Sequence, residues 1–301
     1  MKRFGVDLGG TKIEAIAMAE GGAILSRQRI ATPRDDYAAT VAAITSLVTG
    51  LAANDRGPVG IASPGALSPA TGLMKNANST WLNDKPLDSD LAAALDRPIR
   101  LANDADCFVL SEASDGAAAG AGVVFGVILG TGVGGGIVID GRLLAGANAI
   151  AGEWGHNPLP WPRPEWGEIP GPTCWCDRAG CIETYLSGPG LAADHPDRTK
   201  SSREIVAASE AGDPVARQTM ARYEDRLARA LAHMINILDP HVVVLGGGLS
   251  AIDSLYDAVP RLWSRWIFSD TIATRLLRNT HGDSGGVRGA AWLWPEPEAA
   301  V

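Results

Sequence analysis

The chain of 301 residues has no apolar run long enough to cross a membrane and no block of basic residues. A membrane-spanning helix needs about 18 or more consecutive apolar residues, so we expect no membrane partner. The formal net charge is -8 at pH 7, and a surface without a basic cluster cannot neutralise a nucleic-acid backbone. Residues 1–4 run directly into a predicted strand, so we expect no signal peptide.

Cysteine is also scarce, with four residues in the whole chain. Three of them, Cys174, Cys176 and Cys181, lie within eight positions. Cys174 and Cys176 are too close for an easy disulfide, and disulfide-built secreted domains are smaller and richer in cysteine. We therefore expect a reducing, cytoplasmic environment, in which clustered thiols indicate a metal site.

The length favours two lobes over a single core. We expect a small N-terminal lobe over 1–117, to which a C-terminal helix at about 285–301 returns. A larger lobe with the metal-binding loop is expected over 118–284.

The order of expected elements contains one internal repeat. Residues 3–31 and 122–141 both have the pattern strand, glycine turn, strand, turn, strand. Apolar spacing predicts helices over 36–53 and 215–238, and a strand and a capped helix meet near Asn103. The proline-rich block 158–181 is not expected to hold regular structure.

Both glycine turns of this repeat are candidate phosphate sites. The first contains Asp7, Gly9, Gly10, Thr11 and Lys12, and the second contains Gly130, Thr131, Gly132 and Gly134. Neither is a standard nucleotide motif, because Thr11 stands where a P-loop needs lysine and a strand, not a helix, follows Gly135. Glycine lets backbone N–H groups approach an anion. Two such turns would grip a polyphosphate, with Asp7 facing its Mg²⁺ through water; the alternative is that they are only tight hairpins.

Seven segments then resemble the ROK family of sugar kinases. They are VDLGGTK, GIASPG, LANDAD, LGTGVGGG, GEWGH, CWCDRAGCIE and VVVLGGG, in the family's order, and the resemblance covers residues 4 to about 294. It implies an α/β fold, the duplicated RNase H-like fold of hexokinase and actin with a cleft between the lobes. It also implies ATP with Mg²⁺, a homodimer, and Gly246, Gly247 and Gly248 on the adenosine side.

The resemblance implies the sugar site as well. Asp104 would be the general base for the attacking sugar hydroxyl, and Asn103 would hold a second hydroxyl. Position alone favours a helix-capping role for Asp104. Asp106 is interpreted as a cap. The other implied sugar contacts are Ser63, Pro64, Gly65, Asn78, Glu153, His156 and Glu183. The segments KNANSTWLN and HGDSGGVRGAAWLW are similar to bacterial fructokinases, so we expect D-fructose to be phosphorylated to fructose 6-phosphate, with mannose as a second candidate substrate.

The cysteine cluster has the spacing C-x-C-x4-C, and His156 is the candidate fourth ligand. Cys3His is a closed zinc set, so the zinc is expected to be structural and to order the proline-rich loop; the alternative is three buried thiols. By the resemblance, His156 binds zinc through one ring nitrogen and the sugar through the other.

Three rival functions are considered, and two of them differ from a sugar kinase in features that the sequence contains. A glucokinase or N-acetylmannosamine kinase of the same family would share every motif above. A ROK transcriptional regulator is expected to carry a DNA-binding arm before the DLGGTK motif, which starts here at residue 7 in an acidic chain. An actin-like ATPase would lack the metal cluster and the sugar-facing glutamates.

Overall fold

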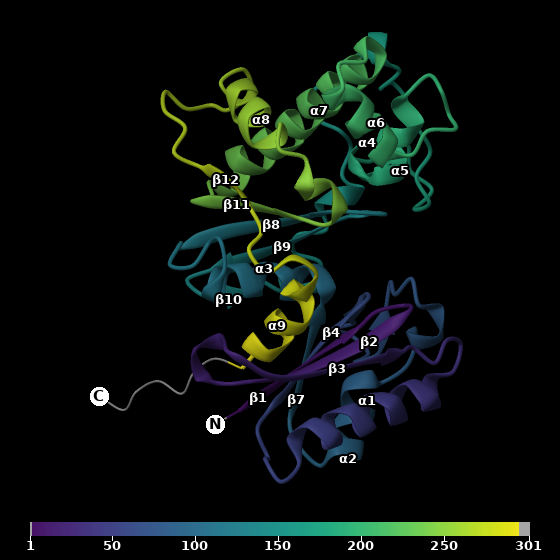
Figure 1. Ribbon diagram of the computed structural model, residues 1–301, viewed down its shortest axis with the longest axis vertical. Coiled ribbons are helices and arrows are strands. Elements are labelled where there is room, and N and C mark those ends of the chain that lie inside the picture. Colours follow the sequence, from purple (N-terminus) through teal and green to yellow (C-terminus); the bar gives the residue numbers. More distant parts are fainter. Residues whose placement is uncertain (1, 295–301) are drawn as a thin grey trace. The chain divides into compact units, whose positions relative to one another are not determined.

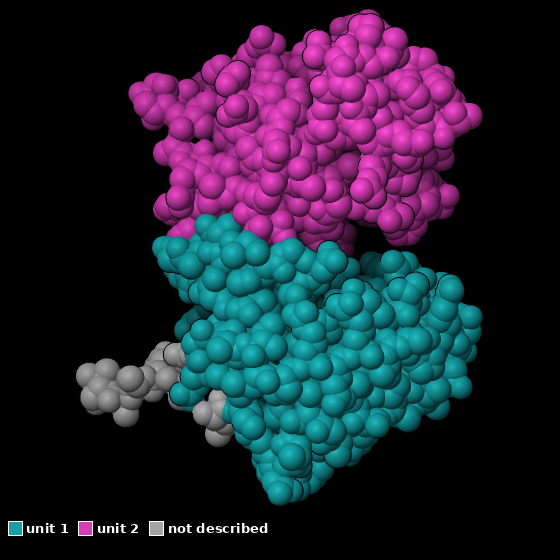
Figure 2. Space-filling model, viewed as in Figure 1, with its two compact units in different colours: residues 1–120, 136–151, 280–301 teal, residues 121–135, 152–279 magenta. Residues whose placement is uncertain are grey.

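The computed structural model describes residues 2–294 of the chain, which folds into two compact units (Figure 1, Figure 2). Unit 1 comprises residues 1–120, 136–151 and 280–301, and unit 2 comprises 121–135 and 152–279. Residues 136–151, which the sequence assigned to the second lobe, therefore pack with unit 1. The lobe boundary near 117 stays a prediction, and the expected helix beyond residue 294 lies outside the described residues.

Unit 1 is built on a five-stranded sheet with the order β3-β2-β1-β4-β7. β1 is antiparallel to β2 and parallel to β4, and β7 is parallel to β4. The strands and helices of this unit are β1 (Arg3–Leu8), β2 (Lys12–Met18), β3 (Ile24–Ala31), β4 (Val59–Ser63), β5 (Ala66–Leu67), β6 (Met74–Lys75), β7 (Ile99–Asn103), β10 (Arg142–Leu143), α1 (Tyr37–Ala52), α2 (Leu87–Leu95), α3 (Asp104–Asp115) and α9 (Gly285–Trp292).

The alternation of side chains along β1 gives this sheet two different faces. Phe4, Val6 and Leu8 are buried in one core cluster together with apolar residues of α1 and α2. Gly5 and Asp7 point to the opposite face, which α9 covers. Asp7 is therefore placed on the α9 face, near the C-terminal end of β1.

Glycines allow α9 to approach its neighbours backbone to backbone. A Cβ at Gly5 would lie 2.1 Å from the Val287 carbonyl oxygen, and one at Gly60 would lie 1.8 Å from the Ala290 carbonyl oxygen. A Cβ at Gly289 would lie 1.6 Å from the carbonyl oxygen of Cys107 in α3. These distances leave no room for a methyl group, so this glycine packing fixes α9 against β1, β4 and α3.

Unit 2 contains a parallel arrangement of β8, β11 and β12, in which β11 pairs with both neighbours. Strand β9 (Val133–Ile139) begins in unit 2 and carries the chain into unit 1. The other elements of unit 2 are β8 (Val123–Leu129), β11 (Val242–Gly246), β12 (Arg275–Arg278), α4 (Glu183–Leu186), α5 (Gly188–Asp194), α6 (Ser202–Glu210), α7 (Pro214–Leu238) and α8 (Leu255–Trp263).

The long helix α7 holds the proline-rich segment through buried ion pairs. Arg226 donates to Glu168 at 2.8 Å, and Arg229 donates to both oxygens of the same carboxylate at 2.9 and 3.0 Å. All three side chains are buried. Glu168 also accepts from the backbone N–H of Arg163. The sequence predicts an amphipathic helix here, but its periodicity does not reveal that arginines on α7 are buried against Glu168.

The repeat expected from the sequence is confirmed. Two strands flank the glycine turn at 9–11, and β8 and β9 flank the glycine turn at 130–132. The helices expected over 36–53 and 215–238 are α1 and α7. Between residues 158 and 181 the structure has one 3-10 turn, Pro164–Trp166, and two isolated bridges. Among the described residues, no helix combines the length and the apolar character that a membrane crossing requires.

The packing of α9 predicts that Gly289→Ala destabilises the protein. The added methyl group meets the Cys107 carbonyl oxygen, and overpacking of this kind costs about 1–3 kcal/mol. Gly50→Ala is the matched control, because Gly50 lies in α1 with its nearest neighbour 3.8 Å from an added Cβ. That control should gain about 0.5–1 kcal/mol from helix propensity. Denaturant unfolding measures both, and an undiminished free energy of unfolding for Gly289→Ala contradicts the packing argument.

Candidate active site

The catalytic candidate Asp104 lies where β7 ends and α3 begins. Asn103 is the N-cap of α3, with its Oδ1 accepting from the Ala105 N–H at 2.9 Å and its Nδ2 donating to the Gly65 carbonyl oxygen at 3.3 Å. The N-cap is therefore Asn103, and Asp106 is not the cap residue that the sequence suggested. Asp104 is exposed, and its Oδ1 also accepts from the Ala105 N–H at 2.8 Å. Asn103 thus fixes the backbone that presents the Asp104 carboxylate.

Asp7 is the second acidic residue in this part of unit 1. Burial, together with the negative charges of Asp104 and Glu14, raises the pKa of Asp7 to about 6, against the lowering effect of Lys12 and Arg29. A Cβ at Gly286 would lie 3.1 Å from an Asp7 carboxylate oxygen. The negative charge of Asp104 adds to the burial that raises the pKa of Asp7, and a bound cation would offset both effects. Carboxylate oxygen is a ligand that Mg²⁺ accepts, so the Asp7 carboxylate fits a nucleotide-borne Mg²⁺.

The first glycine turn is closed by its own backbone and held from a neighbouring strand. The Gly9 N–H donates to the Lys12 carbonyl oxygen at 3.0 Å. Thr32, just after β3, donates its hydroxyl to the Gly9 carbonyl oxygen at 2.7 Å and its N–H to the Thr11 carbonyl oxygen at 3.1 Å. Gly10 and Thr11 remain at least partly exposed at the tip. Thr32 is an anchor of this turn that sequence reasoning missed.

The polar turns of unit 1 divide into buried and exposed positions. Ser63 and Pro64 are buried, whereas Gly65 is partly exposed, with a φ of 75°. A Cβ at Gly65 would lie 2.3 Å from the Lys75 carbonyl oxygen, so the turn requires glycine. Asn78 is exposed. It follows Ala77, whose backbone both donates to and accepts from the Asn83 side chain.

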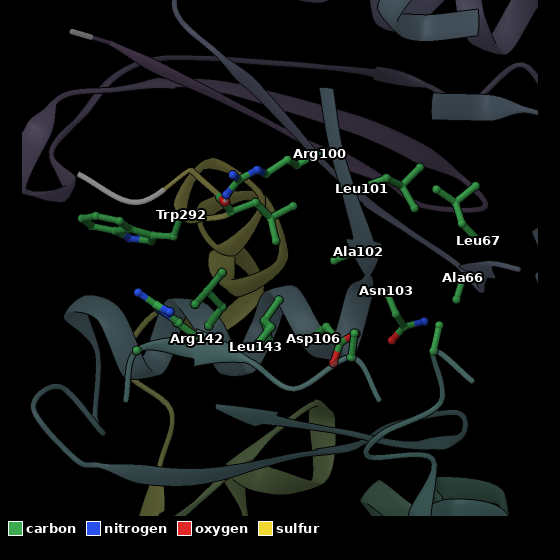
Figure 3. Close-up of a pocket in the computed structure, with 15 residues that line it drawn as sticks. Ala66, Leu67, Arg100, Leu101, Ala102, Asn103, Asp106, Arg142, Leu143 and Trp292 are labelled. Atoms are coloured by element: carbon green, nitrogen blue, oxygen red, sulfur yellow. Dashed lines mark hydrogen bonds between the residues drawn. The ribbon is translucent and has the colours of Figure 1, made fainter. Parts of the chain in front are cut away.

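Unit 1 also contains a cavity of about 630 Å³. Figure 3 shows Asn103 and Ala66 at one end and Arg142 and Trp292 at the other. Asp106 lines this cavity as well. Asn103, the N-cap of α3, therefore also lines this cavity.

The second glycine turn lies in unit 2 and is tied to two other segments. The Gly130 carbonyl oxygen accepts from the Gly188 N–H at 2.8 Å, and the Gly134 carbonyl oxygen accepts from the Trp154 indole at 3.0 Å. The Val133 N–H donates to a Glu183 carboxylate oxygen at 2.9 Å. This turn thus joins the sequence-predicted phosphate residues to one of the predicted sugar residues.

A cavity of about 950 Å³ opens beside that turn within unit 2. Three residues predicted to bind the nucleotide, Gly130, Thr131 and Gly248, line this cavity. Arg203 and Glu210 of α6 line it as well and are polar. Gly247 has a φ of 78°, and a Cβ there would lie 2.5 Å from the Leu129 carbonyl oxygen. The loop 246–248 needs glycine to pass so close to the end of β8. Arg203 and Glu210 were not foreseen, because α6 carries none of the quoted motifs.

The predicted metal ligands lie together in unit 2. The ligand atoms of His156, Cys174, Cys176 and Cys181 are all within 4.8 Å of one another. The His156 Nδ1 lies 3.6 Å from the Cys174 Sγ, and the Cys176 and Cys181 sulfurs are 3.7 Å apart. A tetrahedral zinc, with Zn–S of about 2.3 Å and Zn–N of about 2.0 Å, puts two sulfurs about 3.8 Å apart and a sulfur and a nitrogen about 3.5 Å apart. The four residues fit a closed zinc site.

The same cluster carries the predicted sugar-facing side chains of unit 2. Glu153 is exposed at the start of the 3-10 turn Trp154–His156. The Nδ1 atom of the His156 ring faces the thiols. Glu183 begins α4, two residues after Cys181. The exposed Trp175 touches His156 edge-on and donates its indole N–H to Glu183 at 2.6 Å, a contact that the sequence did not suggest.

Residues 3–297 match the family model described as ROK family. An N-acetyl-D-glucosamine kinase of Erwinia tasmaniensis is 41% identical over 297 residues, covering 96% of this chain and 98% of that protein. A ROK hexokinase from Thermus thermophilus is 32% identical with a TM-score of 0.85, covering 97% of each chain. A ROK glucokinase from Streptomyces griseus, solved with glucose and AMPPNP, is 28% identical with a TM-score of 0.77, covering 99% of this chain and 100% of that chain.

These matches confirm the expected α/β sugar-kinase fold and correct the expected substrate. The prediction of fructose is wrong, because the full-length relative at 41% identity is an N-acetyl-D-glucosamine kinase. The segments that indicated fructokinase therefore do not identify the hexose by themselves. The homodimer, the cytoplasmic location and the absence of nucleic-acid binding stay predictions.

The raised pKa of Asp7 predicts an effect of pH on stability. Because the pKa of Asp7 is higher in the folded protein than in the unfolded chain, protonated Asp7 favours folding. This contribution to the free energy of unfolding is lost as the pH rises through about 6. Asp7→Asn keeps the neutral form, so it should be more stable than wild type at pH 8, by up to about 3 kcal/mol, with the difference shrinking toward pH 5. Urea unfolding in Mg²⁺-free buffer measures this. Asp35→Asn, which removes the same charge from an exposed turn, should show no such trend.

The metal cluster predicts one bound thiophilic ion per chain. Cys176→Ser should lose most of the metal and lower the melting temperature, because a structural site of this kind contributes folding free energy on the order of 10 kcal/mol. Cys107→Ala, which changes the one cysteine outside the cluster, should keep its metal. Elemental analysis after gel filtration reports both. A full complement of metal in Cys176→Ser would show that the four residues do not form the site.

Proposed function

We propose that this chain, which belongs to the ROK family, transfers the γ-phosphoryl group of ATP to the primary hydroxyl of N-acetyl-D-glucosamine. The observation that carries the choice of sugar is the relative at 41% identity, which covers 96% of the chain and is an N-acetyl-D-glucosamine kinase. The choice of ATP is supported by the ROK glucokinase solved with AMPPNP.

Asp104 is the proposed general base. Its carboxylate is exposed at the first position of α3, where the positive end of the helix dipole stabilises a negative charge. Asn103 holds this end of the helix by two hydrogen bonds. In this proposal Asp104 accepts the proton of the C6 hydroxyl as that oxygen attacks the γ-phosphorus. Phosphoryl transfer needs little else from the protein than positioning and charge neutralisation.

Glu153, His156 and Glu183 are the proposed sugar-binding residues of unit 2, and Gly65, Asn78 and Asn103 those of unit 1. His156 has Nδ1 on the side of the thiols, which leaves Nε2 for a sugar hydroxyl. Glu183 has one oxygen held by the Val133 N–H. Ser63 and Pro64 are buried, so the contribution proposed for them is to hold the turn at Gly65.

The nucleotide is assigned to the two glycine turns and to the cavity of unit 2. Gly9 to Lys12 and Gly130 to Gly134 offer backbone N–H groups for phosphate oxygens. The cavity beside Gly130 has small residues, among them Gly188 and Gly248, on its wall, which suits a flat base and ribose. Asp7 would hold the nucleotide's Mg²⁺, which neutralises phosphate charge. ATP and Mg²⁺ would thereby also relieve the repulsion between Asp7 and Asp104.

The proposed base predicts that Asp104→Asn lowers kcat by at least about 10²-fold, since general-base catalysis contributes that much. The KM values should change much less, because the amide keeps the shape of the side chain. Asp106→Asn is the matched control: it makes the same change two residues further along α3, at a side chain that lines the cavity of about 630 Å³ and has no role in the proposed chemistry. Coupled detection of ADP measures both. Turnover of Asp104→Asn within a few-fold of wild type would remove Asp104 from this role.

The proposed substrate is tested by initial rates over N-acetyl-D-glucosamine, N-acetyl-D-mannosamine, glucose, mannose and fructose. We expect the highest kcat/KM for N-acetyl-D-glucosamine, with the product identified as the 6-phosphate by ³¹P NMR. A preference for glucose or N-acetyl-D-mannosamine would support the rival kinases of the same family. Absence of phosphoryl transfer to every sugar in the set would overturn the proposed activity.

A further inference from the structure

Trp175 is the most exposed tryptophan among the described residues, with 73% of its surface accessible. It lies between two metal-ligand candidates, Cys174 and Cys176. Core packing does not account for a large aromatic residue in this position. Trp161, the other tryptophan exposed above 40%, stacks on Trp266 with ring centroids 5.1 Å apart. Trp175 instead contacts His156 and Glu183, two residues of the candidate sugar site.

Its indole N–H donates to the Glu183 Oε1 at 2.6 Å. Its ring meets the His156 ring edge-on, with centroids 4.9 Å apart and planes at 86°. The other carboxylate oxygen of Glu183, Oε2, accepts from the Val133 N–H at 2.9 Å. The carboxylate therefore has one donor on each oxygen, and its rotation about the side-chain axis is fixed from two sides.

The two donors differ in what holds them. Val133 belongs to the rigid strand β9. Trp175 belongs to a short turn in which the Cys174 N–H donates to the Arg178 carbonyl oxygen and the Asp177 N–H to the Cys174 carbonyl oxygen. Two of the four clustered ligands, Cys174 and Cys176, flank Trp175 in this turn, so the cluster of His156 and the three thiols constrains where the indole lies. One oxygen of Glu183 is thus held by the sheet and the other by the metal loop.

We propose that Trp175 is a positioning residue for the sugar: its indole N–H holds Glu183 in the orientation that binds a sugar hydroxyl and makes sugar affinity depend on the metal loop. The inference rests on the proposed function in one respect, that Glu183 contacts the sugar. Trp175 itself contacts neither the phosphates nor the general base in this account. Its loss should therefore act on sugar binding and leave the phosphoryl-transfer step alone.

The test is Trp175→Phe, which keeps an aromatic ring and removes the N–H. A hydrogen bond to a charged group contributes enough to affinity that we expect the KM and the calorimetric Kd for N-acetyl-D-glucosamine to rise about tenfold. The kcat and the KM for ATP should stay within about twofold of wild type. Metal content should be unchanged. Trp161→Phe, made in the same unit at the other exposed tryptophan, should leave all of these constants as they are.

Two further measurements separate positioning from a merely structural role. In a Glu183→Ala background, which leaves the indole N–H no acceptor at position 183, Trp175→Phe should add less than about twofold to the sugar Kd, because its effect passes through that carboxylate. Removing the metal with a chelator should weaken sugar binding in wild type by several-fold more than in Trp175→Phe, by calorimetry in the absence of ATP. Additive effects in both experiments would overturn the inference.

The failure of this inference can be told apart from that of the proposed function. If wild type phosphorylates N-acetyl-D-glucosamine and Trp175→Phe has the same sugar KM, Trp175 is not a positioning residue and the function stands. An equal sugar KM for Trp175→Phe but a raised one for Trp175→Ala would assign the ring face, not the N–H, and would also overturn the inference. If wild type neither binds nor phosphorylates the sugar, both fail together.

Discussion

The candidate site depends on the contact between one imidazole and three thiols. His156, Cys174, Cys176 and Cys181 bring their ligand atoms within 4.8 Å in a segment that otherwise has one 3-10 turn and two isolated bridges. Proline-rich sequence cannot build a ladder or a helix to hold side chains in place. A closed metal site can, because it fixes several backbone points at once. Trp175 lies between two residues of this cluster and donates to Glu183, whose other oxygen accepts from the Val133 N–H.

In each unit, further contacts hold the segments that carry the other candidate site residues. In unit 2, the buried carboxylate of Glu168 and the arginines of α7 hold the proline-rich segment upstream of the cluster. In unit 1, the glycine contacts of α9 hold the face on which Asp7 lies, and Asn103 holds the start of α3. Burying two arginines with a shared carboxylate is costly unless every charge is paired, and here the pairing ties a helix to a loop that lacks its own core.

Much of this arrangement could be predicted from the sequence, because it depends on residues that are close together along the chain. Paired glycine hairpins, a strand that meets a capped helix at Asn103, and thiols at metal-ligand spacing all come from neighbours in the chain. The indole of Trp175 on Glu183, the hydroxyl of Thr32 on the first glycine turn and the arginines under Glu168 come from long-range packing, which periodicity does not encode. The sugar was predicted wrongly because the segments quoted for it are not sufficient to identify the hexose: the chain that carries them is 41% identical to an N-acetyl-D-glucosamine kinase.

A crystal structure of the protein with N-acetyl-D-glucosamine and ADP, in which anomalous scattering locates the metal, tests most directly whether the metal cluster orients the sugar-binding residues. We expect metal on the Nδ1 of His156 and on the three sulfurs, with the Nε2 of the same ring and the carboxylate of Glu183 within hydrogen-bond distance of sugar hydroxyls. A sugar bound without contact to either residue, or an imidazole turned away from the thiols, would contradict this role of the cluster.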